Sequence, residues 1–387
     1  MSSIFQDTEV AFATKTDSQL ERAYFLFNMI KSEKLVKIGT AATNFALKAH
    51  LPVEGLIRAT VFDHFCGGVT EKDCIPNINM NFKKGVSSIL DYSVEGKESE
   101  EEFDNAMNKT LDTIAFAQES SAIPFAVFKP TGFGRFGLYE KLTAGDKLTQ
   151  AELEEWEKVV ARFDLVCSTA YKADIPLLID AEESWMQDAA DDLIEEMMAK
   201  YNTEKAIVYN TLQMYRWDRL DYLKDLEERS KEIGFHIGMK VVRGAYMEKE
   251  RERAENRNYE SPICKNKDAT DENYDACIKY MFDNNMSIYA GTHNENSSIL
   301  LLNYLKNEGR PLNDPKAWFG QLFGMSDNIS FNLGTMGYNV SKYVPFGPVK
   351  DVMPYLIRRA EENTSVAGQT NRELELIKLE RERRKEK

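Results

Sequence analysis

Apolar positions follow two different periods along the chain. Up to about residue 85 they recur at helical spacing, as in Gln19 to Phe27 and Val53 to Phe65, and no segment there has the pattern of a strand. After residue 86 short β-rich runs recur, each followed by a helical or mixed segment. Eight such runs can be counted: Ser87 to Tyr92, Ile123 to Phe128, Ile175 to Ile179, Ala206 to Tyr209, Met239 to Val242, Ser287 to Ala290, Trp318 to Leu322 and Lys342 to Pro345.

The alternation of strands and helices predicts the fold class. Such strands run parallel with right-handed crossovers, and they either close into a barrel or lie open as a doubly wound sheet. Eight runs within residues 86–368 favour the barrel, whose usual length is roughly 250 residues. We therefore predict an α/β protein with an N-terminal helical arm in residues 1–85, a (β/α)8 barrel of the TIM type in residues 86–368, and a charged C-terminal tail in residues 369–387.

A glycine-rich string follows the second run. Gly132, Gly134 and Gly137 in TGFGRFG have the spacing of a dinucleotide-binding fingerprint, in which the third glycine lies in the first turn of a helix. The next helix is expected to begin only near residue 150, where Thr149 and Glu152 form a capping box. We therefore interpret the glycines as shaping a loop, because an isolated glycine match is weak evidence.

Two charged segments are expected at the surface. Residues 247–268 are dense in Arg, Glu and Asn and are predicted to form a mobile loop, because long loops in compact domains are usually lids or disordered. The C-terminal RERRKEK is interpreted as the solvated end of a helix, with a weak contact to an anionic membrane as the alternative.

Composition and charge narrow the function classes. The 387 residues include 49 Lys and Arg against 63 Asp and Glu, a net charge of −14 that argues against a nucleic-acid partner. The five cysteines are scattered and the four histidines form no HExxH pattern, so we expect reduced thiols and no metal site. The N-terminus lacks the layout of a signal or transit peptide, and no apolar run reaches bilayer length. We expect a cytoplasmic protein, with peripheral attachment to the inner membrane as the alternative.

Polar residues stand at the carboxyl ends of the predicted strands, where barrels of this type carry their catalytic residues. One such residue alone would usually be a solvated loop residue. Seven of the eight strand ends carry one, and we predict that they line a single pocket: Lys129, Asp180, Gln213, Lys240 with Arg243, Thr292 with His293, Gln321, and Tyr343.

The segment PYLIRRAEEN gives the sharpest signal. Tyr355, Arg358, Arg359 and Glu362 fall at i, i+3, i+4 and i+7, on one face of a helix. Two adjacent guanidinium groups repel each other unless an anion is nearby. Glu362 can pair with one of them, which leaves the other for a ligand carboxylate. A surface salt-bridge network is the alternative.

Several motifs together resemble the flavin-dependent proline dehydrogenases. FKPTG, LLIDAEESW, NTLQMY, KVVRGAYM, GTHNEN, QLFGM, KYVPFG and YLIRRAEEN occur in this order over roughly residues 86–363. The resemblance implies a β/α barrel that holds FAD non-covalently, oxidises L-proline to Δ1-pyrroline-5-carboxylate and passes electrons to a quinone. It leaves both a monomer and a homo-oligomer open.

The resemblance also implies roles for single residues. Arg358, Arg359 and Lys129 match the residues that hold the substrate carboxylate, and Asp180 matches the acid that pairs with the lysine. Glu362 matches the partner that orients an active-site arginine. The residues that match the wall around the pyrrolidine ring are Tyr343, Tyr355, Tyr246, Ala245 and Leu322.

Five residues match the cofactor contacts of the same family: Gln213, Lys240, Arg243, Thr292 and His293. Two positions depart from the bacterial members, which commonly carry arginine where Lys240 stands, next to the flavin N5, and tryptophan where Met247 stands, near the adenine. With these departures the chain resembles the eukaryotic branch more closely.

Three other functions stay open at this point. A hydroxyproline dehydrogenase of the same superfamily is disfavoured by Tyr343, whose phenol would leave little room for a 4-hydroxyl group. An aldolase could form a Schiff base on Lys129 or Lys240. A non-catalytic amino-acid-binding module would bind proline without transferring electrons.

Overall fold

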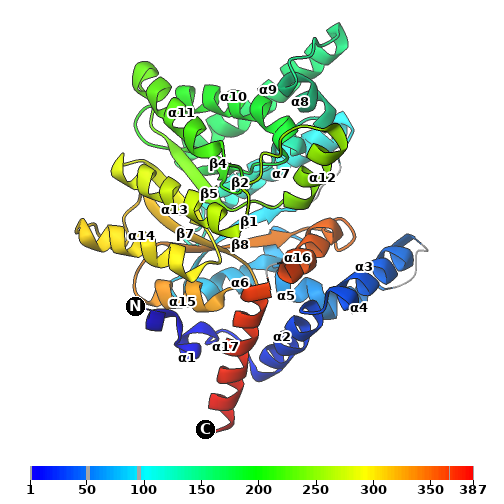
Figure 1. Cartoon of the computed structure of the whole chain (residues 1–387), viewed down its shortest axis with the longest axis vertical. Coiled ribbons are helices and arrows are strands. Elements are labelled where there is room, and N and C mark those ends of the chain that lie inside the picture. Colours follow the sequence, from blue (N-terminus) through cyan, green and yellow to red (C-terminus); the bar gives the residue numbers. More distant parts are fainter. Residues whose placement is uncertain (1, 49–52, 94–96, 366, 387) are drawn as a thin grey trace. The chain divides into compact units, whose positions relative to one another are not determined.

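The chain divides into two compact units. Figure 1 labels the helices and strands that they contain. The computed structural model describes residues 2–48, 53–93, 97–365 and 367–386. Unit 1 combines residues 1–95 with residues 320–387, and unit 2 consists of residues 96–319. Within the described ranges, no helix has the length and apolar character that crossing a membrane requires.

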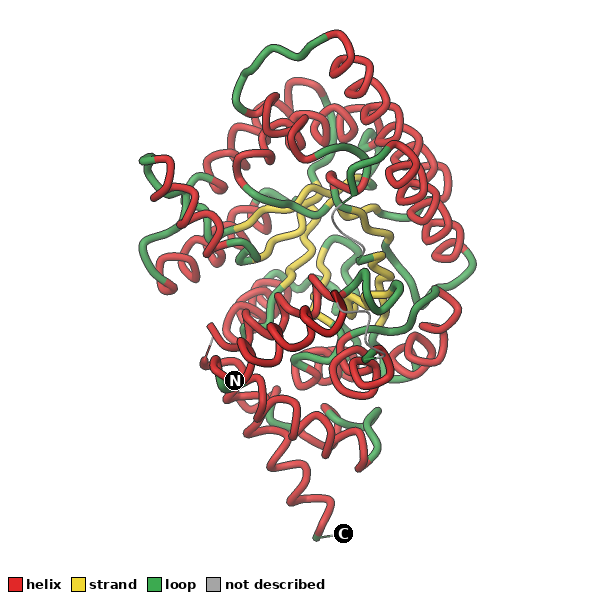
Figure 2. The backbone as a smooth tube through the Cα atoms, turned by 90° about the vertical axis from the view of Figure 1, so that its right-hand side faces the viewer, coloured by secondary structure: helices red, strands yellow, loops and turns green. Residues whose placement is uncertain are grey.

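Eight parallel strands follow one another along the chain, with helices between them (Figure 2). Their hydrogen-bonded order is β1-β8-β7-β6-β5-β4-β3-β2. Unit 1 contains β1 and β8, unit 2 contains β2 to β6, and β7 runs from unit 2 into unit 1. This is the topology of a (β/α)8 barrel, so the predicted fold class is confirmed. The strands are β1 (Ser87–Tyr92), β2 (Ala126–Phe128), β3 (Leu177–Ile179), β4 (Val208–Gln213), β5 (Gly238–Val242), β6 (Ser287–Gly291), β7 (Ala317–Leu322) and β8 (Val340–Phe346).

In unit 2, helices α7, α10 and α13 pack against the strands. The predicted capping box is present at the start of α9, where the Thr149 hydroxyl accepts the Glu152 N–H and the Glu152 carboxylate accepts the Thr149 N–H. The helices of this unit are α7 (Glu100–Gln118), η3 (Pro130–Gly132), α8 (Phe136–Thr143), α9 (Gln150–Ala173), α10 (Ser184–Tyr201), α11 (Arg219–Ile233), α12 (Met247–Arg257), α13 (Lys267–Asp283) and α14 (Glu295–Asn307).

The glycine string is followed directly by a helix. The expectation that no helix begins before residue 150 was wrong, because α8 begins at Phe136 and Gly137 lies in its first turn. Gly134 is explained by packing: a Cβ atom at this position would lie 2.4 Å from Cγ2 of Val159 in α9. Close approach of the turn before α8 to helix α9 therefore accounts for this glycine, as Gly is the residue that permits it.

The segment predicted as a mobile surface loop, residues 247–268, contains helix α12, so the loop prediction was wrong over Met247–Arg257. The helix is fixed by Glu250, whose side chain is fully buried and accepts hydrogen bonds from the Ser184 N–H and hydroxyl, each 2.6 Å long. Asn258 ends the helix in the left-handed conformation.

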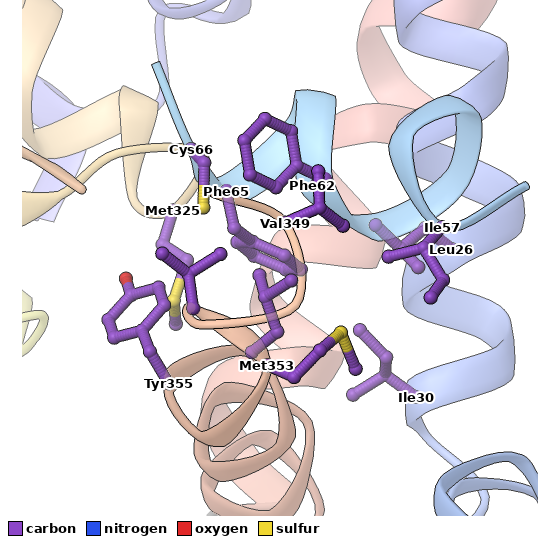
Figure 3. Close-up of a cluster of buried hydrophobic side chains, with 12 residues drawn as sticks. Leu26, Ile30, Ile57, Phe62, Phe65, Cys66, Met325, Val349, Met353 and Tyr355 are labelled. Atoms are coloured by element: carbon purple, nitrogen blue, oxygen red, sulfur yellow. The ribbon is translucent and has the colours of Figure 1, made fainter. Parts of the chain in front are cut away.

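In unit 1 the N-terminal helices share a hydrophobic core with α16, as Figure 3 shows. Leu26 and Ile30 of α2 belong to the same buried cluster as Met353 and Tyr355 of α16. The N-terminal helical segment therefore supports the helix that carries Arg358 and Arg359. The helices are η1 (Ser2–Phe5), α1 (Thr8–Ala11), α2 (Asp17–Ile30), α3 (Glu33–Lys48), α4 (Glu54–Ile57), η2 (Arg58–Phe62), α5 (Asp63–Phe65), α6 (Glu71–Phe82), α15 (Asp327–Thr335), α16 (Met353–Ser365) and α17 (Ala367–Lys385).

The C-terminal segment is a helix whose middle part is packed against the N-terminal helices. Leu374, Leu376 and Ile377 of α17 are buried in a cluster with apolar residues of α1 and α2. Two of the basic residues that follow form ion pairs within the unit: Arg381 lies 2.6 Å from Glu21, and Arg384 lies 2.7 Å from Asp17. The expected helix is therefore present, and its last residues, 381–386, are exposed or half-buried.

A buried ion cluster joins β8, α15 and α17. Asp327 lies 2.8 Å from Lys342 and 2.9 Å from Lys15. Burial alone would raise the pKa of Asp327, but the two ammonium groups outweigh it and hold that pKa well below its usual range. The neighbouring Glu373 accepts the Ser326 N–H, and burial raises the pKa of Glu373 to about 7.

Candidate active site

Asp180 stands at the carboxyl end of β3, with two lysines around it. Its carboxylate lies 2.5 Å from Nζ of Lys240 and 3.6 Å from Nζ of Lys129. The strands explain this arrangement. Phe128 pairs with Ile179 in the β2–β3 register, so the next residues, Lys129 and Asp180, follow neighbouring strand ends. The side chains are only 8–17% exposed, which limits screening by solvent.

Lys240 comes from within strand β5 rather than from its end. A side chain at this position reaches Asp180 because the barrel strands of unit 2 lie side by side in the order β5-β4-β3. Asp180 is therefore shared between two cations, whereas the sequence had assigned it only to Lys129.

Gln213, the last residue of β4, has both ends of its amide fixed by backbone groups. Its Nε2 donates to the Glu182 carbonyl at 2.6 Å, and its Oε1 accepts the Ala245 N–H at 3.3 Å. The loop after β3 and the loop after β5 are thus joined through one side chain. Gly244 precedes Ala245 with φ +128°, and a Cβ there would lie 2.5 Å from the Tyr215 ring.

Arg243, just after β5, is held in one orientation by three partners. Its guanidinium donates to Asp271 at 2.7 Å, to Thr292 at 2.8 Å and to Ser297 at 3.0 Å, and it lies 4.5 Å from the centre of the Tyr274 ring. Burial acts to raise the pKa of Asp271, but its bonds to Lys267 and Arg243 lower that pKa overall. The arginine thereby presents a fixed positive charge at the ends of β5 and β6.

The remaining predicted residues of unit 2 lie beside this group in sequence. His293 follows Thr292 directly after β6 and is half-buried. Tyr246 is the residue before α12, and Nζ of Lys249 lies 5.5 Å from the centre of its ring.

The predicted residues of unit 1 come from β7, β8 and α16. Leu322 ends β7 and Tyr343 lies buried within β8. Tyr355 is buried in the core shared with the N-terminal helices, and the Arg359 guanidinium lies 5.3 Å from the centre of its ring. The side chain of Glu362 lies outside the described residues, so its predicted pairing is not described.

Arg358 and Arg359 stand side by side on α16, as the sequence predicted for a helix in this segment. Arg359 is buried and Arg358 is half-buried. Two neighbouring guanidinium groups thus stand on a helix that the N-terminal helices support.

Gln321, expected among the pocket residues, makes a different contact. Its Oε1 accepts a hydrogen bond of 2.8 Å from the Ser330 hydroxyl of α15, and its side chain is buried. This bond fixes α15 to strand β7. The polar character of Gln321 is therefore explained by helix packing.

Sequence reasoning missed three residues that organise the group. Asp271 orients Arg243. Thr131 and Glu182 are hydrogen-bonded to each other, and they follow Lys129 and Asp180, respectively, by two residues. Both lie within motifs that carry the family resemblance, FKPTG and LLIDAEESW, so these motifs could have indicated them.

Comparison with known proteins identifies the family. The model described as proline dehydrogenase matches residues 74–372. A carbapenem antibiotics biosynthesis protein from Pectobacterium carotovorum subsp. carotovorum is 33% identical over 334 residues, 86% of each chain. A mitochondrial proline dehydrogenase 1 from Dictyostelium discoideum is 30% identical over 426 residues, which cover 97% of this chain and 74% of that protein.

The solved structures agree on the fold. Proline utilization A from Bdellovibrio bacteriovorus, inactivated by N-propargylglycine, superposes with a TM-score of 0.70 at 20% identity. The match covers 94% of this chain but 37% of that longer protein, and it supports the barrel fold alone. The family model and the curated relatives carry the assignment, and the chain therefore belongs to the proline dehydrogenase family of enzymes.

Proposed function

We propose that the chain oxidises L-proline to Δ1-pyrroline-5-carboxylate, with FAD as hydride acceptor and a quinone as final electron acceptor. The observation that carries the proposal is the shared ion pair of Asp180 with Lys129 and Lys240 at the ends of the unit 2 strands. Family membership supplies the reaction, and this group supplies the charges that a small zwitterionic substrate needs.

In this proposal, charged side chains bind and orient the substrate carboxylate. The ammonium group of Lys129, which Asp180 orients, binds this carboxylate. Arg358 and Arg359 of α16 are assigned to bind it as well. Each charged hydrogen bond contributes roughly 1.5–3 kcal/mol, and fixing the carboxylate also fixes the ring. Further contacts to the ring are assigned to Ala245, Tyr246, Leu322, Tyr343 and Tyr355.

The residues assigned to the cofactor suit FAD because all of their side chains can donate hydrogen bonds. A flavin and its phosphates present many acceptor atoms, and Lys240 and Arg243 add positive charge. FAD, when bound, would accept the hydride that leaves C5 of proline. The amine lone pair forms the new C=N bond as the C5–H bond breaks, so the residues must favour an amine that has lost its extra proton. The five residues are Gln213, Lys240, Arg243, Thr292 and His293.

We further propose a cytoplasmic protein that contacts the inner membrane at its surface when a membrane quinone is the acceptor. We also propose that the protein can form a homo-oligomer, and light scattering of the purified protein measures its mass in solution. Cell fractionation tests the membrane contact. Recovery of the protein only in the soluble fraction after reduction by proline would contradict that contact.

The test of the function is an absorbance spectrum taken before and after anaerobic addition of proline. The expected result is a yellow protein whose visible flavin absorption bleaches with proline and returns with a quinone analogue. A colourless protein that takes up no FAD would contradict the proposal.

The same experiment separates the other functions. An aldolase acting through Lys129 or Lys240 would show no bleaching and would be trapped by borohydride with a carbonyl substrate. Both ammonium groups are engaged by Asp180, whereas Schiff-base chemistry needs a free amine. A binding module would bind proline without reducing a dye, and a hydroxyproline dehydrogenase would be bleached faster by hydroxyproline.

A further inference from the structure

Glu182 is a buried carboxylate two residues beyond Asp180. Its side chain accepts the Thr131 N–H at 2.9 Å and the Thr131 hydroxyl at 2.7 Å. Only 6% of the residue is exposed, and burial raises the pKa of Glu182 to about 7. Burying a carboxylate is unfavourable, so a residue of this kind at a strand end calls for a specific role.

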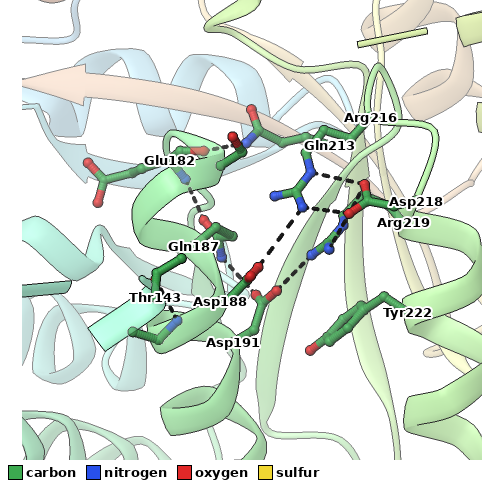
Figure 4. A network of polar contacts seen from close by, with 12 residues as sticks. Thr143, Glu182, Gln187, Asp188, Asp191, Gln213, Arg216, Asp218, Arg219 and Tyr222 are labelled. Carbon is green, nitrogen blue, oxygen red and sulfur yellow. Dashed lines mark hydrogen bonds and ion pairs between the residues drawn. The ribbon is translucent and has the colours of Figure 1, made fainter. Parts of the chain in front are cut away.

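The backbone of Glu182 is fixed as firmly as its side chain (Figure 4). Its N–H donates to Oε1 of Gln187 at 2.8 Å, and its carbonyl accepts Nε2 of Gln213 at 2.6 Å. Gln187 is in turn bonded to Asp191 at 2.8 Å, and Asp191 forms a buried ion pair of 2.8 Å with Arg219. The loop after β3 therefore rests on a network that reaches α10 and α11.

Three strand ends meet at this one residue. Thr131 follows Lys129 by two residues after β2, Glu182 follows Asp180 by two residues after β3, and Gln213 ends β4. The Thr131–Glu182 bonds lie beside the Lys129–Asp180 ion pair as a second link between the same two loops. The 3.6 Å separation of Lys129 and Asp180 is longer than a direct hydrogen bond, so it depends on how the two loops are held.

We propose that Glu182 and Thr131 are positioning residues that hold Lys129 against Asp180 and thereby set the affinity for the substrate carboxylate. Neither residue is assigned a contact with substrate. The inference rests on the proposed function, because it gives the Lys129–Asp180 pair the task of binding a carboxylate. Gln213 extends the same link to the loop after β4.

The test uses the flavin-loaded protein and the variant Thr131→Val, which keeps the shape and the N–H but removes the hydroxyl donor. Binding of cyclopentanecarboxylate, a five-membered ring without the amine, is followed by the change in the flavin spectrum. We expect its Kd and the KM for proline to rise about tenfold, with a smaller change in kcat. Thr131→Ser, which keeps the hydroxyl, should restore both values to within about twofold.

A matched control removes a hydroxyl elsewhere. Thr169 of α9 bonds the Leu165 carbonyl of its own helix at 2.7 Å, so Thr169→Val should change neither Kd nor KM. The decisive comparison repeats Thr131→Val in an Asp180→Asn background. If Thr131 acts through the ion pair, its effect on the Kd disappears there, as expected of coupled residues.

The proposal is overturned if Thr131→Val lowers the affinity equally with and without Asp180, or if Thr131→Ser behaves like Thr131→Val. Should Thr131→Val fail to fold, Glu182→Gln replaces it in the comparison with and without Asp180, because the glutamine keeps one oxygen that can accept the Thr131 N–H. These outcomes differ from failure of the proposed function, in which the wild-type protein itself would neither bind FAD nor oxidise proline.

Discussion

Asp180→Asn is the perturbation whose effect follows most directly from the geometry. The change removes the negative charge that lies 2.5 Å from Lys240 and 3.6 Å from Lys129 and leaves two ammonium groups facing each other. Each charged hydrogen bond contributes roughly 1.5–3 kcal/mol. The amide oxygen of the asparagine can still accept one weaker hydrogen bond from a lysine, so part of this energy is retained. We expect a loss of about 2–4 kcal/mol in transition-state stabilisation, which corresponds to roughly a 30- to 1,000-fold fall in kcat/KM.

Steady-state kinetics with proline and a quinone analogue measure this loss. Because one carboxylate serves both lysines, KM should rise through Lys129 and kcat should fall through Lys240. Asp164→Asn is a matched control: Asp164 lies 2.5 Å from Lys200 in an exposed ion pair between α9 and α10, and surface pairs contribute little. A kcat/KM within threefold of the wild type in Asp180→Asn would refute the reasoning, as would an equal loss in the control.

Three further predictions address other parts of the molecule. Arg358→Met should raise the KM for proline at least tenfold while the protein stays yellow, and unchanged kinetics would remove the arginine from the carboxylate site. Tyr343→Ser should raise kcat/KM for 4-hydroxyproline relative to proline, as measured by competition; an unchanged ratio would contradict the role of the phenol. The pKa of Glu373 is about 7, so the folded state binds its proton more tightly than the unfolded state does, and stability falls as pH rises from about 4.5 to 7. Glu373→Gln should reduce the fall between pH 5 and pH 8, measured by urea unfolding, by about 2.5 kcal/mol, and an identical fall in both proteins would contradict the assignment.

The strands were predicted from the sequence because their apolar runs are short and regular, but their ends were not. Ile123 was placed in the second strand, whereas its N–H bonds the Ser120 carbonyl in a turn. The fourth strand extends to Gln213 through polar residues. Asn210 and Thr211 can be buried there because the Asn210 amide donates a hydrogen bond to Asp191 and the Thr211 hydroxyl donates one to the Ile179 carbonyl. These partners are distant in sequence, so the local sequence pattern does not indicate them.

In the candidate site, too, the sequence identified residues but not the contacts between them. The sequence identified Lys129, Asp180 and Lys240 by their positions at or near strand ends and by resemblance. It did not show that Asp180 pairs with both lysines, because this depends on the order of the strands in the sheet. Helix α12 was mistaken for a loop for a similar reason, since its buried Glu250 is satisfied by Ser184, 66 positions earlier.

Proline oxidation by the flavin-loaded protein is tested most directly by a single-turnover titration of the anaerobic protein with L-proline, in which flavin absorbance and Δ1-pyrroline-5-carboxylate are quantified together. We expect one molecule of product for each flavin reduced, and Asp180→Asn should need far more proline to reach the same end point. Reduction without the product, or product without reduction, would contradict it.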